Sequence, residues 1–352
     1  MKTVSFFTVH QAPHNTFTFK CLEEQYIINA IYLHERLADY GWNSDSFYYP
    51  GKINPSLYTY IKIAVNSDII IISGWHSYKY LILIMILSVL RKRFGIYLDL
   101  DPDSLKRFGG LKKALLKRVP FIFITGIYGE KLLKRYLKRN NIYNFPYGVI
   151  KTDLNLVNDI NNRRKLCIQN GDKIKVFISN RFIHRKGYHL VRSLLIHLKE
   201  ISCLEKFQFT IVGDGPLYNE EKLALFNIDN TIKFYRWVEY SLYKELMSET
   251  DVLLHCSKFE PYGIPPVDAF LLHKTIVVSS RVYSLHDIIE LGGRVLVFRY
   301  KDEGGLQHIF RSICLNTDKL YDSDHKVKIV QNHPYLFCDQ HLNAINRVLT
   351  EL

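Results

Sequence analysis

Two carboxylates, Glu260 and Asp268, flank a segment that could bind a phosphate group. The stretch L-L-H-C-S-K-F-E-P-Y-G-I-P-P-V-D-A predicts a strand end, a loop and a helix entered at Pro265-Pro266, because proline suits the first helical turn. Free N–H groups at the positive end of that helix would bind a phosphate well; they belong to Tyr262, Gly263 and Ile264. An acid on either side could hold hydroxyl groups, which is the arrangement that a sugar nucleotide requires. The plainer alternative is a strand–loop–helix unit with two solvated acids.

Two basic residues, Arg181 and Lys186, follow another predicted strand, Lys175–Ser179, and precede a predicted helix over Tyr188–Lys199. A planar guanidinium and a mobile ammonium at the mouth of one strand–loop–helix turn can neutralise a leaving diphosphate. That neutralisation is the main electrostatic task in breaking a glycosyl–phosphate bond. The alternative is a pair of solvated bases in a loop, and the strand before them together with Gly187 after them favours the functional interpretation.

A third loop carries glycines. The predicted strand Phe207–Val212 ends in Gly213-Asp214-Gly215-Pro216, where glycine permits close backbone approach, consistent with a nucleotide packed above the sheet. A further predicted strand, Thr231–Phe234, leads through Arg236 to Val238.

Four motifs in this order resemble those of retaining glycosyltransferases with the GT-B fold, especially family 4. They are P-Y-G-V at 146–149, R-x4-K-G at 181–187, V-G-D-G-P at 212–216, and E-x7-D at 260–268. The resemblance implies that Glu260 contacts the donor sugar and that Asp268 holds the ribose hydroxyls. It implies that Arg181 and Lys186 clamp the diphosphate without a metal ion, beside the loops that carry Gly213, Asp214 and Val238.

The chain departs from this family at several of these positions. Asp268 stands where the family usually has the longer Glu, and Asn180 and Arg236 replace glycines. The segment 281–284 replaces a glycine pair near the donor sugar, and the segment 9–15 lacks the glycine-rich loop that often follows the first strand.

The first half alternates predicted strands and helices, which favours a doubly wound α/β domain with ligands beyond the strand C-termini. Strands are predicted over Thr3–Val9, Asp68–Ile72, Phe94–Leu98 and Phe121–Thr125, and helices over Glu23–Tyr40, Tyr78–Leu90, Leu111–Arg118 and Tyr128–Arg139. His76 and Asp101 follow two of the strands. They could act as a proton handler and an acceptor-orienting acid, or they could belong to helix-start clusters.

The predicted architecture is α/β and GT-B, with two Rossmann-like domains facing a central cleft. An acceptor-binding domain is predicted over 1–155 and a nucleotide-sugar-binding domain over 156–332. A C-terminal helix over 333–352 would cross back onto the first domain. A length of 352 residues is consistent with two domains.

Composition predicts a reduced, cytoplasmic protein. The six cysteines lie far apart without a C-x-x-C pair, which favours free thiols. No secretory signal is visible, and the most apolar stretch, Tyr80–Leu90, is too short for a membrane span and predicts a buried helix. A composition rich in Lys, Asn, Ile and Tyr suggests an AT-rich genome, such as that of a large DNA virus of algae.

The net charge of +13 is concentrated in the first half, where residues 91–140 contribute +10. Bases and leucines alternate there at helical spacing, so these helices could contact an anionic membrane peripherally or bind a polyanion. The alternative, which we favour, is a set of solvated amphipathic helices whose leucines belong to the core.

The predicted function is therefore retaining, metal-independent transfer of a sugar from a GDP- or UDP-sugar, with a preference for a GDP-mannose-like donor. The acceptor would be a glycan, a glycoprotein or a lipid-linked sugar. A nucleotide-sugar epimerase or phosphorylase of the same fold is the nearest alternative. A basic nucleic-acid-binding protein is a more distant one, because it leaves Glu260 and Asp268 without a role, and no nucleic-acid partner is expected.

Overall fold

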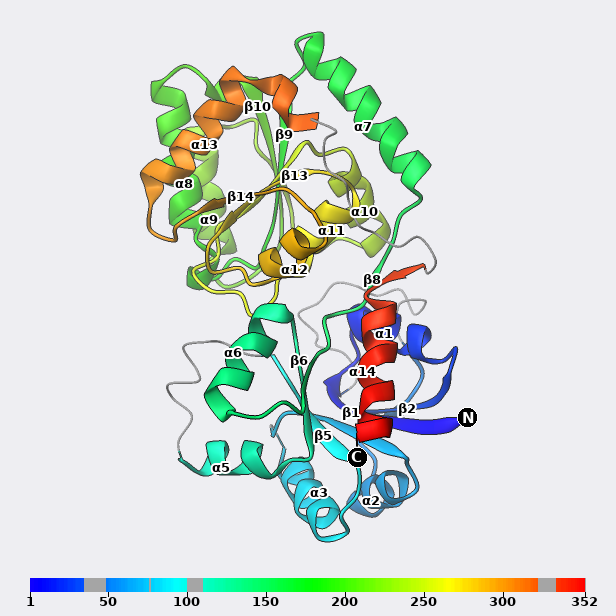
Figure 1. Cartoon of the computed structure of the whole chain (residues 1–352). Coiled ribbons are helices and arrows are strands. Elements are labelled where there is room, and N and C mark those ends of the chain that lie inside the picture. Colours follow the sequence, from blue (N-terminus) through cyan, green and yellow to red (C-terminus); the bar gives the residue numbers. More distant parts are fainter. Residues whose placement is uncertain (35–48, 76, 100–109, 322–333, 352) are drawn as a thin grey trace. The chain divides into compact units, whose positions relative to one another are not determined.

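The computed structural model describes residues 1–34, 49–75, 77–99, 110–321 and 334–351, which form two compact units (Figure 1). The first unit comprises the described residues up to Ile150 together with those from 334 onward. The second unit comprises the described residues from Lys151 to Tyr321. Both units are α/β, and the parallel sheet of each confirms the predicted fold class.

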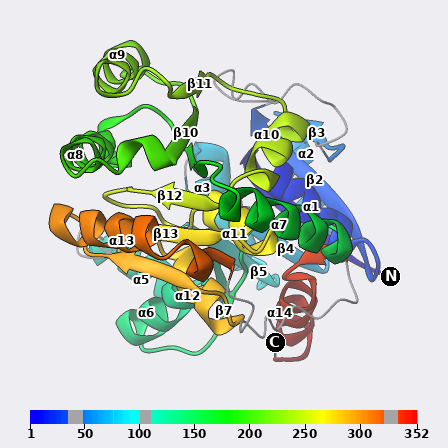
Figure 2. The ribbon, with the colours of Figure 1, turned by 90° about the horizontal axis from the view of Figure 1, so that it is seen from above.

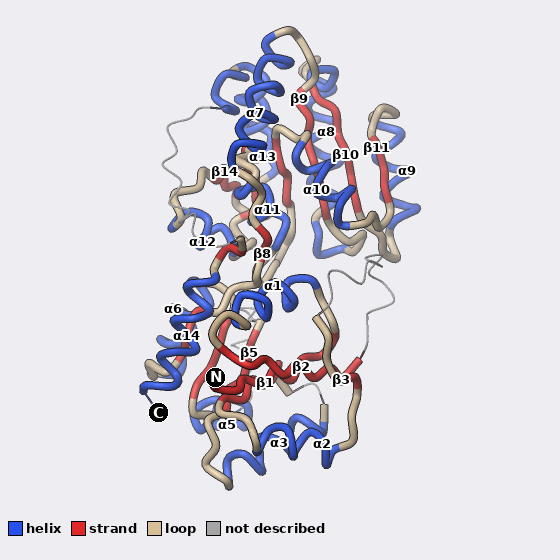
Figure 3. Tube along the Cα trace, turned by 90° about the vertical axis from the view of Figure 1, so that its right-hand side faces the viewer, coloured by secondary structure: helices blue, strands red, loops and turns tan. Residues whose placement is uncertain are grey.

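The first unit is built on a seven-stranded parallel sheet in the order β3-β2-β1-β4-β5-β6-β7. Figure 3 labels four of its strands, β1, β2, β3 and β5. Its strands carry runs of Ile, Phe and Tyr because both faces of the sheet are covered by helices. The strands are β1 Lys2–His10, β2 Tyr26–His34, β3 Lys52–Ile53, β4 Ile69–Ser73, β5 Phe94–Leu98, β6 Phe121–Ile124 and β7 Ile142–Asn144.

Two helical layers enclose this sheet. One layer packs on the side chains of Phe7, Ile70 and Ile96 and contains α2 Leu57–Val65, α3 Tyr78–Val89, α5 Gly110–Arg118 and α6 Ile127–Leu137. The other layer packs on Val4 and Phe123 and contains α1 Pro13–Leu22 and α14 Cys338–Glu351.

The predicted helix over Glu23–Tyr40 is wrong in its described part. Residues Tyr26–His34 form β2, which pairs in parallel with β1 from Lys2↔Tyr26 to His10↔His34. Its isoleucines and tyrosines favour a strand, and the pairing buries Ile31 and Tyr32 on opposite faces of the sheet. The helix that precedes β2 is α1, which begins at Pro13 directly after the first strand.

The C-terminal segment is part of the first unit. Its helix α14 packs against α1 and β7, and β15 Tyr335–Leu336 pairs antiparallel with β8 Val149–Ile150. A disulfide joins Cys21 of α1 to Cys338 at the start of α14. The prediction that all six cysteines are free thiols is therefore wrong for this pair, because tertiary packing brings together residues 317 positions apart. The other four cysteines are free.

The second unit is built on a six-stranded parallel sheet in the order β11-β10-β9-β12-β13-β14. The strands are β9 Ile174–Ser179, β10 Phe207–Val212, β11 Lys233–Tyr235, β12 Val252–His255, β13 Thr275–Ser279 and β14 Val295–Phe298. Every strand predicted in this half is present, because each is a short apolar run bounded by turn residues.

Helices cover both faces of the second sheet (Figure 2). The first face is packed by α8 Tyr188–Glu200, α9 Tyr218–Ile228 and α13 Glu303–Leu315, with Leu194, Leu195 and Phe310 fully buried. The remaining helices are α7 Leu154–Gln169, α10 Tyr240–Ser248, α11 Ile264–Leu271 and α12 Ser284–Glu290. Within the described ranges, no helix combines the length and apolar character needed to span a membrane.

Candidate functional site

The candidate site lies where the strand order of the second sheet reverses direction. Strand β9 is paired with β10 on one side and with β12 on the other. The loops after β9 and β12 therefore leave neighbouring strand ends and lead to different helices. In open parallel sheets, ligands bind at such a switch point, beyond the carboxyl ends of the strands.

Glycines allow the loops at this edge to pack closely. Gly187 has a φ of +75°, and a Cβ atom there would lie 2.1 Å from the Cys256 carbonyl oxygen. A Cβ atom at Gly213 would lie 1.9 Å from the Asn180 carbonyl oxygen. The Lys258 N–H then donates to the Arg185 carbonyl oxygen over 2.7 Å, which ties the β12 loop directly to the β9 loop.

The central contact is an ion pair between Lys186 and Glu260. Lys186 lies in a short 3-10 helix, His184–Lys186, and its ammonium donates to Glu260 Oε2. Both side chains are largely buried, with 8% of Lys186 and 14% of Glu260 exposed. Burial lowers the pKa of Lys186, and the carboxylate of Glu260 opposes that effect. Both residues were predicted from the sequence motifs, and the structure places them in contact.

The charge of Glu260 is maintained by its neighbours. Burial by itself would raise the pKa of this carboxyl group, but the neighbouring His255 ring and the charge of Lys186 lower it to about 2. Glu260 is therefore an anion at neutral pH, able to accept hydrogen bonds from sugar hydroxyls.

Acid stability should depend on this carboxylate. The ordinary pKa of Glu260 is 4.5 and its folded value is about 2, so it contributes stability above the unfolded value that is lost as pH falls through the folded one. We expect Glu260→Gln to flatten the fall in the free energy of unfolding between these pH values. Urea unfolding of both proteins across that range measures the difference; equal slopes would contradict the prediction.

Two residues of this site were not assigned a role from the sequence. Arg185 Nη1 lies 3.4 Å from Glu260 Oε2 and donates to the Phe259 carbonyl oxygen over 3.0 Å. His255, at the buried end of β12, has Nε2 3.9 Å from Glu260 Oε2 and 3.1 Å from Ser257 Oγ. Burial lowers the pKa of His255, so its ring is neutral at pH 7. The available signal was a polar residue ending an otherwise apolar strand.

Arg181 opens the β9 loop beside this pair. Its positive charge, together with that of Arg185, disfavours the charge on Lys186. Three cations thus lie near one another on the loop after β9, two of them in contact with Glu260, and this excess of positive charge suits an anionic ligand.

The backbone of the Glu260 loop is clamped to the segment after β13. The Glu260 N–H donates to the Arg281 carbonyl oxygen over 2.9 Å, and the Ser284 N–H donates to the Tyr262 carbonyl oxygen over 3.0 Å. Gly263, with a φ of +92°, then leads into α11 at Ile264. The first N–H groups of α11 have no partner within the helix, so the loop remains a candidate phosphate site.

Three buried polar atoms near these loops lack a hydrogen-bond partner among the described residues. They are Asn180 Oδ1, His255 Nδ1 and Ser284 Oγ. Because unsatisfied buried groups are costly, their occurrence just after β9, at the end of β12 and at the start of α12 is consistent with a polar ligand at this edge.

Asp268, the second acid of the motif, makes its contacts with α10 rather than with the Lys186–Glu260 pair. It lies in α11, is 1% exposed, and accepts hydrogen bonds from Tyr243 over 3.0 Å and Lys244 over 3.4 Å. Burial raises the pKa of Asp268, and the charge of Lys244 opposes that effect. Its carboxylate is therefore held against α10 rather than presented to solvent.

Arg236 stands where the family with similar motifs has glycine, and it contacts the loop that follows β10. Arg236 Nη1 lies 3.0 Å from Asp214 Oδ2, and its guanidinium stacks over the Tyr218 ring at 4.4 Å. Gly213 makes the close approach to Asn180 described above, and Val238 is buried after β11.

Two of the predicted site residues belong to the first unit. His76 and Asp101 lie outside the described residues. Across the part of the chain that the structure describes, no group of three or more His, Cys, Asp or Glu side chains is arranged to hold a metal ion.

Parts of the chain are similar in sequence to known proteins. Residues 159–323, within the second unit, match the family model "Glycosyl transferases group 1". An uncharacterized 41.2 kDa protein from the cps region of Klebsiella pneumoniae is 28% identical over 222 residues, covering 62% of this chain. An uncharacterized glycosyltransferase of Methanocaldococcus jannaschii is 26% identical over 164 residues, covering 43% of this chain. The aligned parts span 59% and 41% of these relatives.

Solved structures resemble the whole chain. HepE of Anabaena, crystallised with UDP and glucose, superposes with a TM-score of 0.71 at 14% identity, covering 100% of both chains. WaaG, a glycosyltransferase involved in lipopolysaccharide biosynthesis, superposes with a TM-score of 0.60 at 12% identity, covering 98% of this chain and 95% of its own. The protein therefore has the GT-B architecture, and its second unit contains the segment that matches glycosyl transferases group 1.

Proposed function

We propose that the protein is a glycosyltransferase that takes a sugar from a nucleoside-diphosphate sugar bound at the edge of the second unit. The observation that carries the proposal is the buried Lys186–Glu260 pair with Arg181 and Arg185 beside it, at the point where the strand order reverses. Cations there can hold a diphosphate, and the adjacent carboxylate can hold sugar hydroxyls. The match to glycosyl transferases group 1 supports the same assignment.

The reaction breaks the bond between sugar C1 and a phosphate oxygen. The leaving nucleoside diphosphate takes the bonding electron pair, and Arg181, Arg185 and Lys186 stabilise its growing negative charge. An acceptor hydroxyl forms the new bond to C1 on the same face, and its proton passes to the departing phosphate oxygen. The configuration at C1 is retained in this scheme.

The ribose is proposed to lie near Asp268. Because both carboxylate oxygens of Asp268 are engaged inside the protein, we assign the direct contact to Lys244, which Asp268 orients from 3.4 Å. Lys244 remains partly exposed. On this proposal Lys244→Met and Asp268→Asn share one defect, a raised KM for the donor.

The acceptor is proposed to be a glycan, a glycoprotein or a lipid-linked sugar that binds the first unit, where His76 and Asp101 would act. The donor is proposed to be a GDP- or UDP-sugar. The solved complex of HepE with UDP-glucose makes UDP-glucose a donor to test beside GDP-mannose.

The test is an NMR time course of the purified protein with a panel of UDP-, GDP- and dTDP-sugars in the presence of EDTA. We expect slow release of free sugar from one donor, first in the donor's own anomeric form. We expect this release to persist in EDTA, because the three basic side chains supply the charge that a metal ion would otherwise provide.

The outcomes separate the competing functions. Release in the opposite anomeric form would overturn retention, and release only after addition of a divalent cation would overturn metal independence. Conversion of one nucleotide sugar into another would indicate an epimerase, and release that requires inorganic phosphate would indicate a phosphorylase. If no donor is consumed and none raises the melting temperature, the proposed function fails.

A further inference from the structure

The outer face of α3 in the first unit exposes a continuous apolar stripe. Leu81, Met85 and Val89 recur every four residues and therefore lie on one face of the helix. Met85 is 60% exposed and Val89 is 82% exposed. Tyr78 extends the stripe at one end and Leu90 at the other, and both are exposed.

This stripe corrects the prediction of a buried helix at Tyr80–Leu90. The inner face of α3 is buried as predicted, through Tyr80, Leu83, Ile84 and Leu87. The outer face is equally apolar because the helix is hydrophobic all round, and only one side can pack against the sheet. A helix of this composition on the outside of a domain leaves an exposed apolar surface, and surfaces of this kind mark interaction sites.

The leucines of the neighbouring basic helices do not form this surface. Leu116 of α5 and Leu133 and Leu137 of α6 are buried in the same core as the inner face of α3. The structure therefore supports the core role that we favoured for those three leucines, and the exposed apolar stripe lies on α3.

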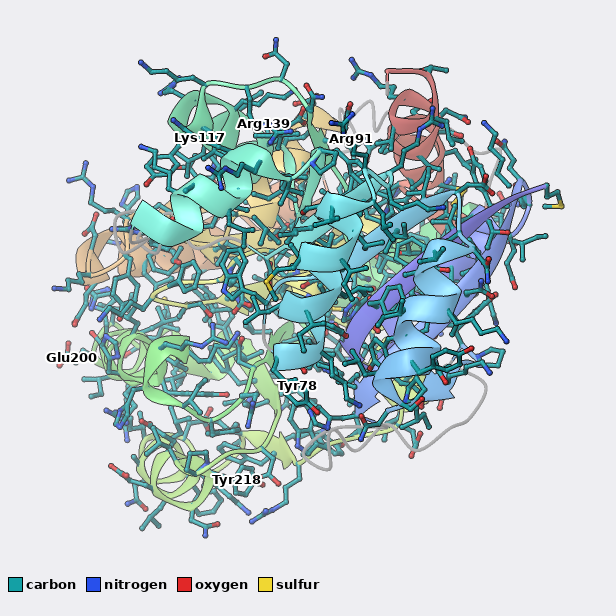
Figure 4. The ribbon with its side chains drawn as sticks, turned by 90° about the horizontal axis from the view of Figure 1, so that it is seen from below. Tyr78, Arg91, Lys117, Arg139, Glu200 and Tyr218 are labelled. Atoms are coloured by element: carbon teal, nitrogen blue, oxygen red, sulfur yellow. A yellow bond between two sulfur atoms is a disulfide. The ribbon has the colours of Figure 1, made fainter. Side chains whose placement is uncertain are left out.

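Basic residues lie at the C-terminal end of the stripe, and three helices of this layer carry no acidic residue. The sequences of α2, α3 and α5 contain no Asp or Glu. Arg91 follows the C-terminal end of α3, and Figure 4 shows Lys117 and Arg139 on that same side of the layer, with Tyr78 at the opposite end of α3. Lys117 lies in the last turn of α5.

We propose that this surface, formed by α3 with the basic residues around Arg91 and Lys117, docks peripherally on an anionic lipid bilayer. Its basic residues complement anionic headgroups. Its apolar side chains can enter the headgroup region, as those of an interfacial helix do. A second copy of the chain fits less well, because α2, α3 and α5 carry no acidic side chain that could pair with the basic residues around Arg91 and Lys117. The proposal does not depend on the sugar chemistry of the second unit.

The experiment is co-sedimentation of the full chain with vesicles of phosphatidylcholine, with and without phosphatidylglycerol. We expect binding to the mixed vesicles that weakens with salt, and little binding to phosphatidylcholine alone. Met85→Glu/Val89→Glu should lower the partition coefficient about tenfold or more, because it places negative charge on the docking stripe. Arg91→Glu should lower it several-fold while leaving the apolar residues intact.

The matched control is Leu223→Glu on α9 of the second unit, a leucine that is 63% exposed and distant in sequence from the stripe. It should bind like the wild type. The proposal is overturned if the wild type ignores the mixed vesicles, or if the control loses as much binding as the double variant. It is also overturned if sedimentation velocity shows a dimer that Met85→Glu/Val89→Glu abolishes. Donor consumption in solution, measured on the same variants, should be unchanged and reports separately on the proposed function.

Discussion

Replacing Lys186 by methionine should lower kcat/KM for donor consumption by about 10²–10³-fold, the usual effect of removing one group that stabilises a developing oxyanion. The Lys186 ammonium lies at the end of β9, pairs with Glu260, and is nine-tenths buried. In a buried site its charge acts on the leaving diphosphate with little screening by water. Methionine keeps most of the apolar stem and removes only the charge. Donor consumption by the NMR assay measures the effect.

The matched control for this change is Lys199→Met. Lys199 lies at the far end of the helix that follows Lys186, and its ammonium donates to the Ile228 carbonyl oxygen over 3.3 Å. Its replacement should leave kcat/KM within about twofold of the wild type. If Lys186→Met is as active as Lys199→Met, the assignment of the diphosphate site to the β9 loop is wrong.

Glu260→Ala should destabilise the fold by about 3–5 kcal/mol, because it leaves the buried Lys186 charge without its carboxylate partner. It should also abolish donor consumption. In this variant burial lowers the pKa of Lys186 without opposition, so the penalty is complete at neutral pH and shrinks as pH rises toward the ordinary value for lysine. The stability gap between wild type and variant should therefore narrow in alkaline buffer. Urea unfolding at several pH values measures it.

Two comparisons make the Glu260 result specific. Glu249→Ala removes a carboxylate that pairs with the exposed Arg163 and with Lys175, and such surface pairs contribute only about 0–1 kcal/mol. Lys186→Met/Glu260→Ala should be more stable than Glu260→Ala alone, because no unpaired buried charge remains. A Glu260→Ala protein as stable as Glu249→Ala would contradict the role of the ion pair.

Much of the second unit could be predicted from local sequence. The strand Phe207–Val212 occurs with the predicted bounds, and the predicted strand Lys175–Ser179 begins one residue earlier, at Ile174, because short apolar runs between turn residues in a parallel sheet leave few alternatives. Arg181, Lys186 and Glu260 could be selected because each follows such a strand, and parallel strands end at one edge of the sheet.

The first unit shows where local pattern fails. Residues Tyr26–His34 contain enough leucine, alanine and isoleucine to suit either a helix or a strand, and only pairing with β1 decides for the strand. Likewise, Cys21 and Cys338 give no local signal of a disulfide, since their proximity depends on α14 packing against α1.

The sequence by itself determined which loops carry charge and in what order, because residue type and position after a strand are local properties. Only the tertiary structure decided how those charges are paired. It placed Lys186 against Glu260, with Arg185 and His255 beside them, and it turned Asp268 toward Lys244 inside the protein. It also left one face of α3 in solvent. Pairing, burial and exposure depend on which helices cover each face of a sheet, and that arrangement is set by contacts between residues far apart in the chain.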